Sequence, residues 1–334
     1  MQKKILEKAF IMLGVILMLP GCTHRSHIVT KRIIVEIGKK NDVSFCAQEP
    51  PPITIWIHGT MFLKKPFFHE IFAQDALLNL AIYMDKDFYS HQIAELLYQQ
   101  DPGQFPLETL YAFSWSGKLS AMSRFDAAKK LYHQLIELIE KYKKKWALYP
   151  KINIIAHSHG ANVALNLGLI EKIYQKKLKI DTLLLLACPV QKETMHYAGS
   201  KEFRRIYSLY SSLDMVQVIA PQQGSTKKPF SKRIFPGHLK VVQAKVKLNG
   251  KAIFHTDFTS RYFIQSIPSL LEKLHELEED YAQYVAKKIV LHIILQKQKS
   301  KYYNVATARK RYPLKKKLYA QNLFKKKDFR DIYL

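Results

Sequence analysis

Residues 152–165 read INIIAHSHGANVAL, and this stretch decides the fold. Its first part, Ile152–Ala156, is short, apolar and rich in β-branched residues, which predicts a strand. Its last part begins a run of helix formers that extends from Ala161 to Tyr174. Only four residues separate the two, so we expect a sharp turn at Ser158. Gly160 is small, which allows the strand and the helix to approach each other closely.

Segments of the same two kinds alternate along the rest of the chain. Before the quoted stretch we predict strands at Ile53–Ile57 and Thr109–Trp115, and helices at Asp75–Met84 and Ser123–Trp146. After it, the predicted strands are Ile180–Leu186, Arg205–Tyr210 and His238–Leu248. Apolar strands that alternate with helices indicate an α/β fold, with a mostly parallel central sheet and helices on both faces.

Proline and charge set the expected boundaries of this domain. Pro50-Pro51-Pro52 block a helix directly before the first of these strands. We therefore expect a linker at residues 22–52, the α/β domain at residues 53–298 and a basic tail at residues 299–334. Within the linker, Ile33–Ile37 has the pattern of an edge strand. Ser269–Gln298 is expected to form one long amphipathic helix, or two helices broken near Asp280.

The first 21 residues have the pattern of a signal peptide. Three lysines precede an apolar run at residues 9–19, which is too short to favour a ~20-residue membrane span. The next residues, Leu19-Pro20-Gly21-Cys22, resemble the lipobox of bacterial lipoproteins, whose cysteine becomes the lipid-modified first residue. The resemblance implies a cell-envelope protein that Cys22 anchors to a membrane. The alternatives are a secreted or periplasmic protein and an uncleaved anchor.

Two cysteines remain after Cys22, namely Cys46 and Cys188. The compartment permits disulfides, but the spacing of the two residues does not indicate one. The sequence leaves open a disulfide between these two cysteines or two independent buried thiols. Two independent thiols is the simpler interpretation.

The chain is strongly basic, with a formal net charge of +26. Fifteen basic and two acidic residues lie between Ala286 and Leu334. Such a tail is either a solvated extension or a surface for anionic phospholipid. The sequence has no zinc-finger spacing, no lysine-containing phosphate loop and no aromatic RNA-binding motif. Nucleic acid is therefore not an expected partner.

The turn at Ser158 resembles a known motif. Ala156-His157-Ser158-His159-Gly160 is similar to the nucleophile elbow of the α/β-hydrolase superfamily, G-x-S-x-G, with alanine at the first glycine. The resemblance spans about residues 53–275 and implies that Ser158 is a nucleophile, with the backbone N–H of His159 directed at a developing oxyanion. His58-Gly59-Thr60-Met61 lies where that superfamily has its oxyanion loop. The N–H of Thr60 or Met61 is thus the implied second donor.

A serine nucleophile requires a histidine base and an acid that orients it. In this superfamily the order along the chain is serine, acid, histidine, and the acid follows the carboxyl end of a strand. Asp214 follows the predicted strand Arg205–Tyr210 in this way. By contrast, Asp181 and Glu202 lie at the starts of their strands, at the opposite edge of the sheet.

His255 is the base that the same order implies. It follows the last predicted strand, whereas His238 opens that strand. Ser158, Asp214 and His255 are therefore the predicted triad, and Asp257 is the rival for the acid. His157 and His159 flank the serine. We expect their side chains to point away from Ser158 and to form part of the cleft wall.

These residues predict a serine hydrolase that cleaves carboxylic esters through an acyl-enzyme, in the manner of lipases and esterases. Neither a metal nor a cofactor is expected. The expected partners are an ester or lipid substrate and a membrane, reached through Cys22 and the basic tail. Alternatives are a thioesterase, amidase or peptidase with the same triad, and a non-catalytic envelope lipoprotein that keeps the fold.

The lipobox makes a prediction of its own. Cys22→Ser should prevent lipid attachment and shift the protein from the membrane fraction to the soluble fraction. Intact-mass measurement of the mature N-terminus checks this directly. An unmodified chain that begins at another residue would exclude lipidation at Cys22.

Overall fold

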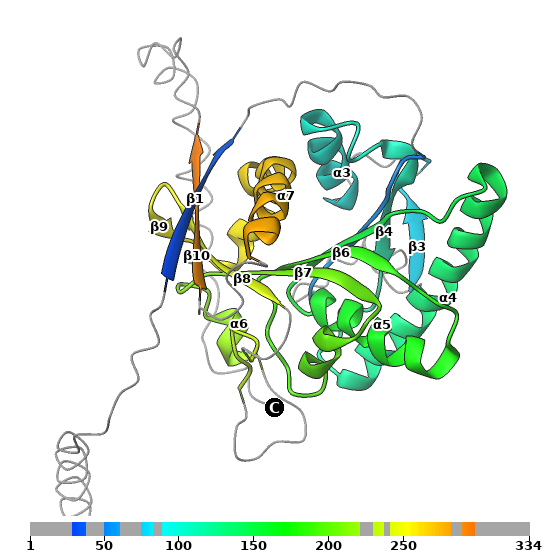
Figure 1. Cartoon of the computed structure of the whole chain (residues 1–334). Helices are drawn as coiled ribbons and strands as arrows, with labels where there is room; N and C mark the ends of the chain where they lie inside the picture. The colour runs from blue at the N-terminus through cyan, green and yellow to red at the C-terminus, as the bar shows by residue number, and fades with distance from the viewer. Residues whose placement is uncertain are drawn as a thin grey trace, which may run out of the picture. The chain divides into compact units, whose positions relative to one another are not determined.

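The computed structural model describes residues 29–37, 50–60, 75–82, 89–220, 230–236, 241–281 and 289–297. In these ranges ten strands form one sheet, in the order β1-β10-β8-β7-β6-β5-β2-β4-β3, and β9 pairs with β8 (Figure 1). Every pairing is parallel except β3 with β4 and β8 with β9. The strands are β1 Val29–Ile37, β2 Ile53–Ile57, β3 Ala76–Asn79, β4 Leu110–Ser114, β5 Ile152–His157, β6 Ile180–Leu186, β7 Phe203–Tyr210, β8 Val242–Leu248, β9 Lys251–Ala252 and β10 Ile289–Lys297.

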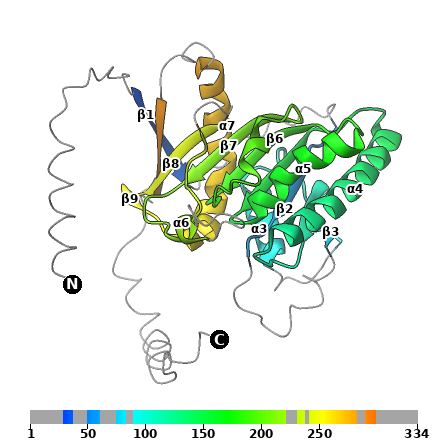
Figure 2. The ribbon, with the colours of Figure 1, turned by 90° about the horizontal axis from the view of Figure 1, so that it is seen from below.

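Helices cover both faces of the sheet. They are α3 Tyr89–Gln100, α4 Ala121–Trp146, α5 Gly160–Tyr174, α6 Val216–Ile219 and α7 Arg261–Tyr281, and the short 3-10 turns are Leu107–Thr109, Met195–Gly199 and His255–Thr259. Helices α3 and α7 lie on one face, and α4 and α5 lie on the other (Figures 1 and 2). The predicted α/β fold class is therefore confirmed. Among the helices described, none has the length and apolar character needed to cross a membrane.

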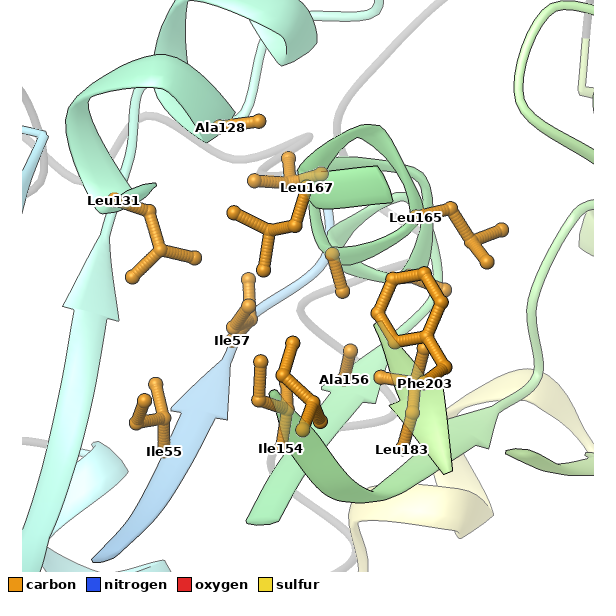
Figure 3. Packing of buried hydrophobic residues seen from close by; sticks show 14 of the residues in the cluster. Ile55, Ile57, Ala128, Leu131, Ile154, Ala156, Leu165, Leu167, Leu183 and Phe203 are labelled. Carbon is orange, nitrogen blue, oxygen red and sulfur yellow. The ribbon is translucent and has the colours of Figure 1, made fainter. Parts of the chain in front are cut away.

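The period-two alternation of the strands divides the core into two layers. In β2, Ile55 and Ile57 face α4 and α5, whereas Trp56 faces α3 and α7. The same alternation holds in β6, where Leu183 packs below α5 and Leu184 packs on the opposite side. Figure 3 shows the first layer, in which these strand residues meet the side chains of the two helices. Strands buried on both faces explain why β5 and β6 are nearly continuous apolar runs.

Several predicted elements are confirmed by the structure. Ile53–Ile57 and Ile180–Leu186 are strands with the predicted bounds, and α4 and α5 begin within two residues of the predicted starts. Ile33–Ile37 belongs to β1, which is an edge strand and joins the same sheet beside β10.

The predicted helix at Asp75–Met84 is wrong. Residues 76–79 form β3, which pairs antiparallel with β4. The helix propensity of its alanine and leucine residues is outweighed, because the strand completes the edge of the sheet and the adjacent Leu80 is buried. Helix α4 also supports this edge: the Leu77 N–H donates to Gln134 Oε1 at 2.7 Å, and Lys130 pairs with Asp75 at 2.7 Å.

The predicted helix at Ser269–Gln298 is wrong at both ends. Helix α7 begins earlier, at Arg261, and runs through Pro268, although a proline removes one helical hydrogen bond. A continuous buried stripe offsets this cost, and it consists of Phe263, Ile264, Ile267, Leu270, Leu271 and Leu274. The chain then forms β10, because the apolar run at residues 289–295 fits between β1 and β8 as a parallel strand.

The sequence analysis missed α3. Its buried residues Ile93, Ala94 and Leu97 have the i, i+1, i+4 spacing of a helix that packs on a core. The pattern spans only twelve residues, and it lies between the predicted helix Asp75–Met84 and the predicted strand Thr109–Trp115, where we predicted no element. Helix α3 packs against α7 on the same face of the sheet.

The two-layer core gives a prediction about stability. Leu183 is fully buried between β6 and α5, so Leu183→Ala should lower the free energy of unfolding by about 2–5 kcal/mol. Urea unfolding measures the change. Ile173→Ala, on an exposed position of α5, is the control and should cost less than about 1 kcal/mol. Equal losses in the two variants would contradict the assigned core.

Candidate active site

The turn between β5 and α5 holds Ser158 in a strained backbone conformation. Its φ is 52°, in the left-handed region that non-glycine residues rarely adopt. The Ser158 N–H donates to the Leu186 carbonyl at 2.8 Å, which ties the turn to the end of β6. Helix α5 begins two residues later at Gly160, so the serine lies at the amino end of that helix. This is the geometry that the elbow resemblance predicts.

Two glycines allow the turn to lie against the loop that follows β2. A Cβ at Gly160 would lie 2.4 Å from the His58 carbonyl oxygen, which is too close for any side chain. A Cβ at Gly59 would lie 2.6 Å from the Ser158 Cβ. The contact arises because β2 and β5 pair in parallel with Ile57 opposite Ala156, so both strands end at the same place. The His58 loop and Ser158 are therefore in direct contact.

His58 fixes this loop through both of its ring nitrogens. The Trp115 N–H donates to His58 Nε2 at 3.2 Å, so the ring proton is on Nδ1, which donates to the Gly59 carbonyl at 2.7 Å. The Trp115 indole N–H donates to the His58 carbonyl at 2.8 Å, and the two rings stack with centroids 5.8 Å apart. Burial lowers the pKa of His58 to about 4. His58 is thus a neutral structural residue of the loop.

The structure brings Asp214 and His255 together. His255 Nδ1 lies 2.8 Å from Asp214 Oδ2, and the Asp214 side chain is fully buried whereas that of His255 is 13% exposed. Asp214 follows β7 and His255 opens the 3-10 turn after β9. With Nδ1–H donated to the carboxylate, His255 Nε2 carries the free lone pair.

Two residues that the sequence analysis missed hold the loop of Asp214. The backbone N–H of Gln217 donates to Asp214 Oδ1 at 3.1 Å, and its side chain donates to the Cys188 carbonyl at 2.9 Å. The Arg233 Nε donates to the Asp214 carbonyl at 3.0 Å. The Gln217 N–H bond to Asp214 spans only three residues, whereas the side-chain bonds of Gln217 and Arg233 join segments that are distant in sequence, so no local pattern indicates these two.

The rival acids are engaged elsewhere. Asp257 Oδ2 accepts the Phe254 N–H at 2.7 Å and caps the same 3-10 turn that contains His255. Asp181 accepts the Ile152 N–H at 3.0 Å at the amino edge of the sheet. Glu202 directly precedes β7 at that same edge. Of these carboxylates, only that of Asp214 meets the His255 ring.

His157 lies against His255 on the side of the elbow. The two rings are 4.8 Å apart between centroids, and the His157 Nε2–H donates to the His255 carbonyl at 3.3 Å. Burial and, to a smaller extent, the neighbouring His255 lower the pKa of His157 to about 3. The neutral ring therefore links the strand before Ser158 to the backbone of His255. The expectation of a cleft-wall residue did not include this contact.

His159 lies in a buried polar region behind the elbow. Its Nδ1 is 3.4 Å from Asn162 Nδ2, and the Asn162 side chain binds Thr194 Oγ1 at 2.5 Å. Burial and, to a smaller extent, nearby Arg124 lower the pKa of His159 to about 3. Asn162 also donates to the Pro189 carbonyl at 3.1 Å, which holds the loop after β6 against α5.

Of the other predicted site residues, Thr60 is described and follows Gly59 beside the elbow, whereas Met61 and Cys22 lie outside the described residues. Cys188 is a free, buried cysteine, and burial raises its pKa; Cys46 lies outside the described residues. Within the described ranges, no group of three histidine, cysteine, aspartate or glutamate residues is arranged to hold a metal ion.

Comparison with known proteins identifies no family. No family model matches the chain, and no curated protein matches it. Among solved structures, an arylesterase has 11% identity and a TM-score of 0.31, covering 73% of this chain and 67% of its own. Carboxyl esterase 2 from the fungus Tuber melanosporum has 9% identity and a TM-score of 0.32, covering 77% and 75%. Carboxylesterase CesB from Bacillus subtilis has 10% identity and a TM-score of 0.26, covering 73% and 76%. Likeness this weak carries no argument about chemistry, so function has to be argued from the residues.

The neutral histidines give a prediction about pH. The pKa values of His58, His157 and His159 are about 4, 3 and 3 in the folded protein, below the ordinary 6.5. Between about pH 6.5 and 4 the unfolded chain therefore binds more protons, and stability should fall as pH falls. Each ring contributes a loss of up to about 1.4 kcal/mol per pH unit in this window. Urea unfolding at pH 7 and pH 5 measures it.

The control for this effect is an exposed ring. His157→Gln should reduce the dependence of unfolding free energy on pH, whereas His196→Gln, on an exposed position, should leave it unchanged. A slope that His157→Gln does not alter would contradict a neutral, buried His157.

Proposed function

We propose that this protein is a serine hydrolase that cleaves carboxylic esters. The observation that carries the proposal is the 2.8 Å contact between Asp214 and His255, two residues 41 positions apart in the chain. His157, the residue before Ser158, contacts His255, and the backbone of Ser158 is held at φ 52°, as a nucleophile elbow requires. A serine in a strained turn, a histidine with a free Nε2 and a buried carboxylate are the parts that acyl transfer requires.

The proposed mechanism assigns one role to each residue. Ser158 Oγ attacks the acyl carbon, and His255 Nε2 accepts the serine proton and returns it to the leaving alcohol. Asp214 holds the imidazole in the reactive tautomer and stabilises the imidazolium that forms. Water then attacks the acyl-enzyme with His255 again as the base, which releases the carboxylic acid and restores Ser158.

Backbone N–H groups supply the proposed oxyanion site. The His159 N–H lies at the amino end of α5, where the helix dipole favours negative charge. The proposed second donor is the N–H of Thr60, which follows Gly59 in the loop that lies against Ser158, or the N–H of Met61, which is outside the described residues. The bonds between His58 and Trp115 hold the start of that loop before any substrate arrives. Donors that are already in position need no reorganisation as charge develops.

The proposed location is the cell envelope, with the chain anchored to a membrane through lipidated Cys22. The lipobox-like residues 19–22 support this part of the proposal. An anchored hydrolase has ester-containing lipids at hand, so we propose a lipid ester as its substrate. A panel of esters of increasing acyl length, together with a thioester and an anilide, separates this activity from that of a thioesterase or an amidase.

Replacing the nucleophile tests the proposal most directly. Ser158→Ala should lower kcat for ester hydrolysis by about 10³-fold or more, because the members of a triad act as a unit. The wild-type protein should also be labelled by a fluorophosphonate, and the variant should not. Near wild-type turnover in a correctly folded Ser158→Ala variant would end the serine-hydrolase proposal, and an unlabelled, inactive wild type would favour a non-catalytic lipoprotein.

Two aspartates near His255 provide a matched pair of variants. Asp214→Asn should lower kcat by about 10³-fold or more, because an amide does not hold the reactive tautomer. Asp257→Asn should change kcat by less than about tenfold, because an asparagine oxygen still accepts the Phe254 N–H and caps the turn. Initial rates on a soluble ester measure both. The reverse order of the two effects would assign the acid to Asp257.

A further inference from the structure

An apolar surface surrounds the acid and the base of the proposed site. Six large apolar side chains on it are between 45% and 61% exposed, and they are Leu213, Met215, Ile219, Phe230, Ile234 and Phe254. Single exposed apolar residues are ordinary, but a group of this size around one site is typical of an interaction surface. We call these six residues the apolar rim.

Hydrogen bonds show that the segments of the rim lie together. Leu213 and Met215 flank Asp214, and Ile219 ends α6. Residues 230–236 pack on α6, because the Ser231 N–H donates to the Ala220 carbonyl at 3.0 Å and Ser231 Oγ donates to the Gln217 carbonyl at 2.5 Å. The Ile253 N–H donates to Ser211 Oγ at 3.0 Å, which brings the segment of Phe254 to the loop of Asp214. The three chain segments that carry the rim residues are therefore neighbours.

The charge of these segments is one-sided. Residues 211–220, 230–236 and 249–256 contain a single acidic residue, Asp214, which is buried and bonded to His255, and the next acidic residue, Asp257, is half-buried and accepts the Phe254 N–H. The same segments carry Lys232 and Lys251, which are exposed, and Arg233, which is half-buried. Exposed apolar side chains bordered by lysines match a bilayer that contains anionic lipid. The apolar side chains can enter the hydrocarbon, and the anionic headgroups attract the lysines.

We propose that the apolar rim docks on an anionic phospholipid bilayer and holds the mouth of the active site against it. The delivery of lipid esters to the docked site rests on the proposed function. The docking itself does not require turnover. The occupant is a bilayer that presents phosphate headgroups. Figures 1 and 2 place α6, the helical part of the rim, outside the two helical layers that cover the sheet.

A second group of exposed apolar residues lies at the opposite edge of the sheet and provides a control. Trp146 ends α4, Leu148 and Tyr149 follow it, and Ile173 lies near the end of α5. The aromatic rings of this group already have cationic partners, with Lys145 Nζ 5.0 Å from the Trp146 ring and Lys143 Nζ 5.6 Å from the Tyr149 ring. Docking through this group would turn His255 away from the membrane.

Tryptophan reporters on the two surfaces test the proposal. Phe230→Trp and Ile173→Trp are introduced separately into the full-length Ser158→Ala protein, so that both positions, each 57% exposed in the wild type, are compared without turnover. The probes are vesicles of brominated phosphatidylcholine, with and without phosphatidylglycerol. We expect blue-shifted, bromine-quenched fluorescence from position 230 in the anionic vesicles, and little change from position 173. Because both proteins carry the same native tryptophans and the same N-terminus, only the reporter position differs.

Each alternative result overturns the proposal. Stronger quenching at position 173 would assign docking to the other surface, and equal quenching without phosphatidylglycerol would remove the requirement for anionic lipid. A concentration-dependent dimer in the absence of vesicles, abolished by Ile219→Ser/Phe230→Ser, would assign the rim to a second copy of the chain.

With Ser158 intact, the consequence for activity is measured on a fluorogenic ester embedded in the same anionic vesicles. Ile219→Ser/Phe230→Ser should lower the rate by about tenfold or more, since two apolar side chains lose their burial in lipid. The matched Leu148→Ser/Ile173→Ser variant, which removes residues of equal exposure, should not. A quenched reporter at position 230 in a protein that hydrolyses no ester would retain the docking surface and refute the proposed function, so the two ideas fail separately.

Discussion

The parallel pairing of β2 with β5 is the constraint on which the proposed site depends. It ends both strands at the same edge of the sheet and presses the turn at Ser158 against the loop at Gly59, with no room for a Cβ at Gly59 or at Gly160. The left-handed backbone of Ser158 costs free energy, which the surrounding sheet and α5 offset by fixing both sides of the turn. In the proposed mechanism, this fixed turn places the His159 N–H at Ser158 before a substrate binds.

Around this rigid centre, the proposed acid and the proposed base come from distant parts of the chain. Asp214 follows β7 and His255 follows β9, and their contact forms because β7 and β8 are neighbours in the sheet. His157 then joins the backbone of His255 to the elbow strand. Its ring stays neutral because burial disfavours the imidazolium.

The same edge of the sheet combines a buried polar interior with an apolar exterior. Asp214 is enclosed and bonded, whereas its neighbours Leu213 and Met215 point into solvent. A loop that buries its single carboxylate and exposes apolar side chains interacts more favourably with a hydrocarbon surface than with water. The proposed docking face and the proposed triad therefore arise from one loop conformation, in which alternate residues serve the interior and the exterior.

The sequence by itself determined the elbow, the buried strands and the α/β class, because each depends on local patterns: the small residues around Ser158, the apolar runs of β2, β5 and β6, and the 3.6-residue periodicity of α4. It also indicated Asp214 and His255 through their order relative to the strands. Only the tertiary structure decided that residues 76–79 and 289–297 are strands, since neighbouring strands there outweigh helix propensity. It alone decided that α7 continues through Pro268, where a continuous buried stripe outweighs one lost hydrogen bond. It also showed Asp214 at His255 and Asp257 at a helical cap, a distinction between two carboxylates that depends on where each side chain lies in space.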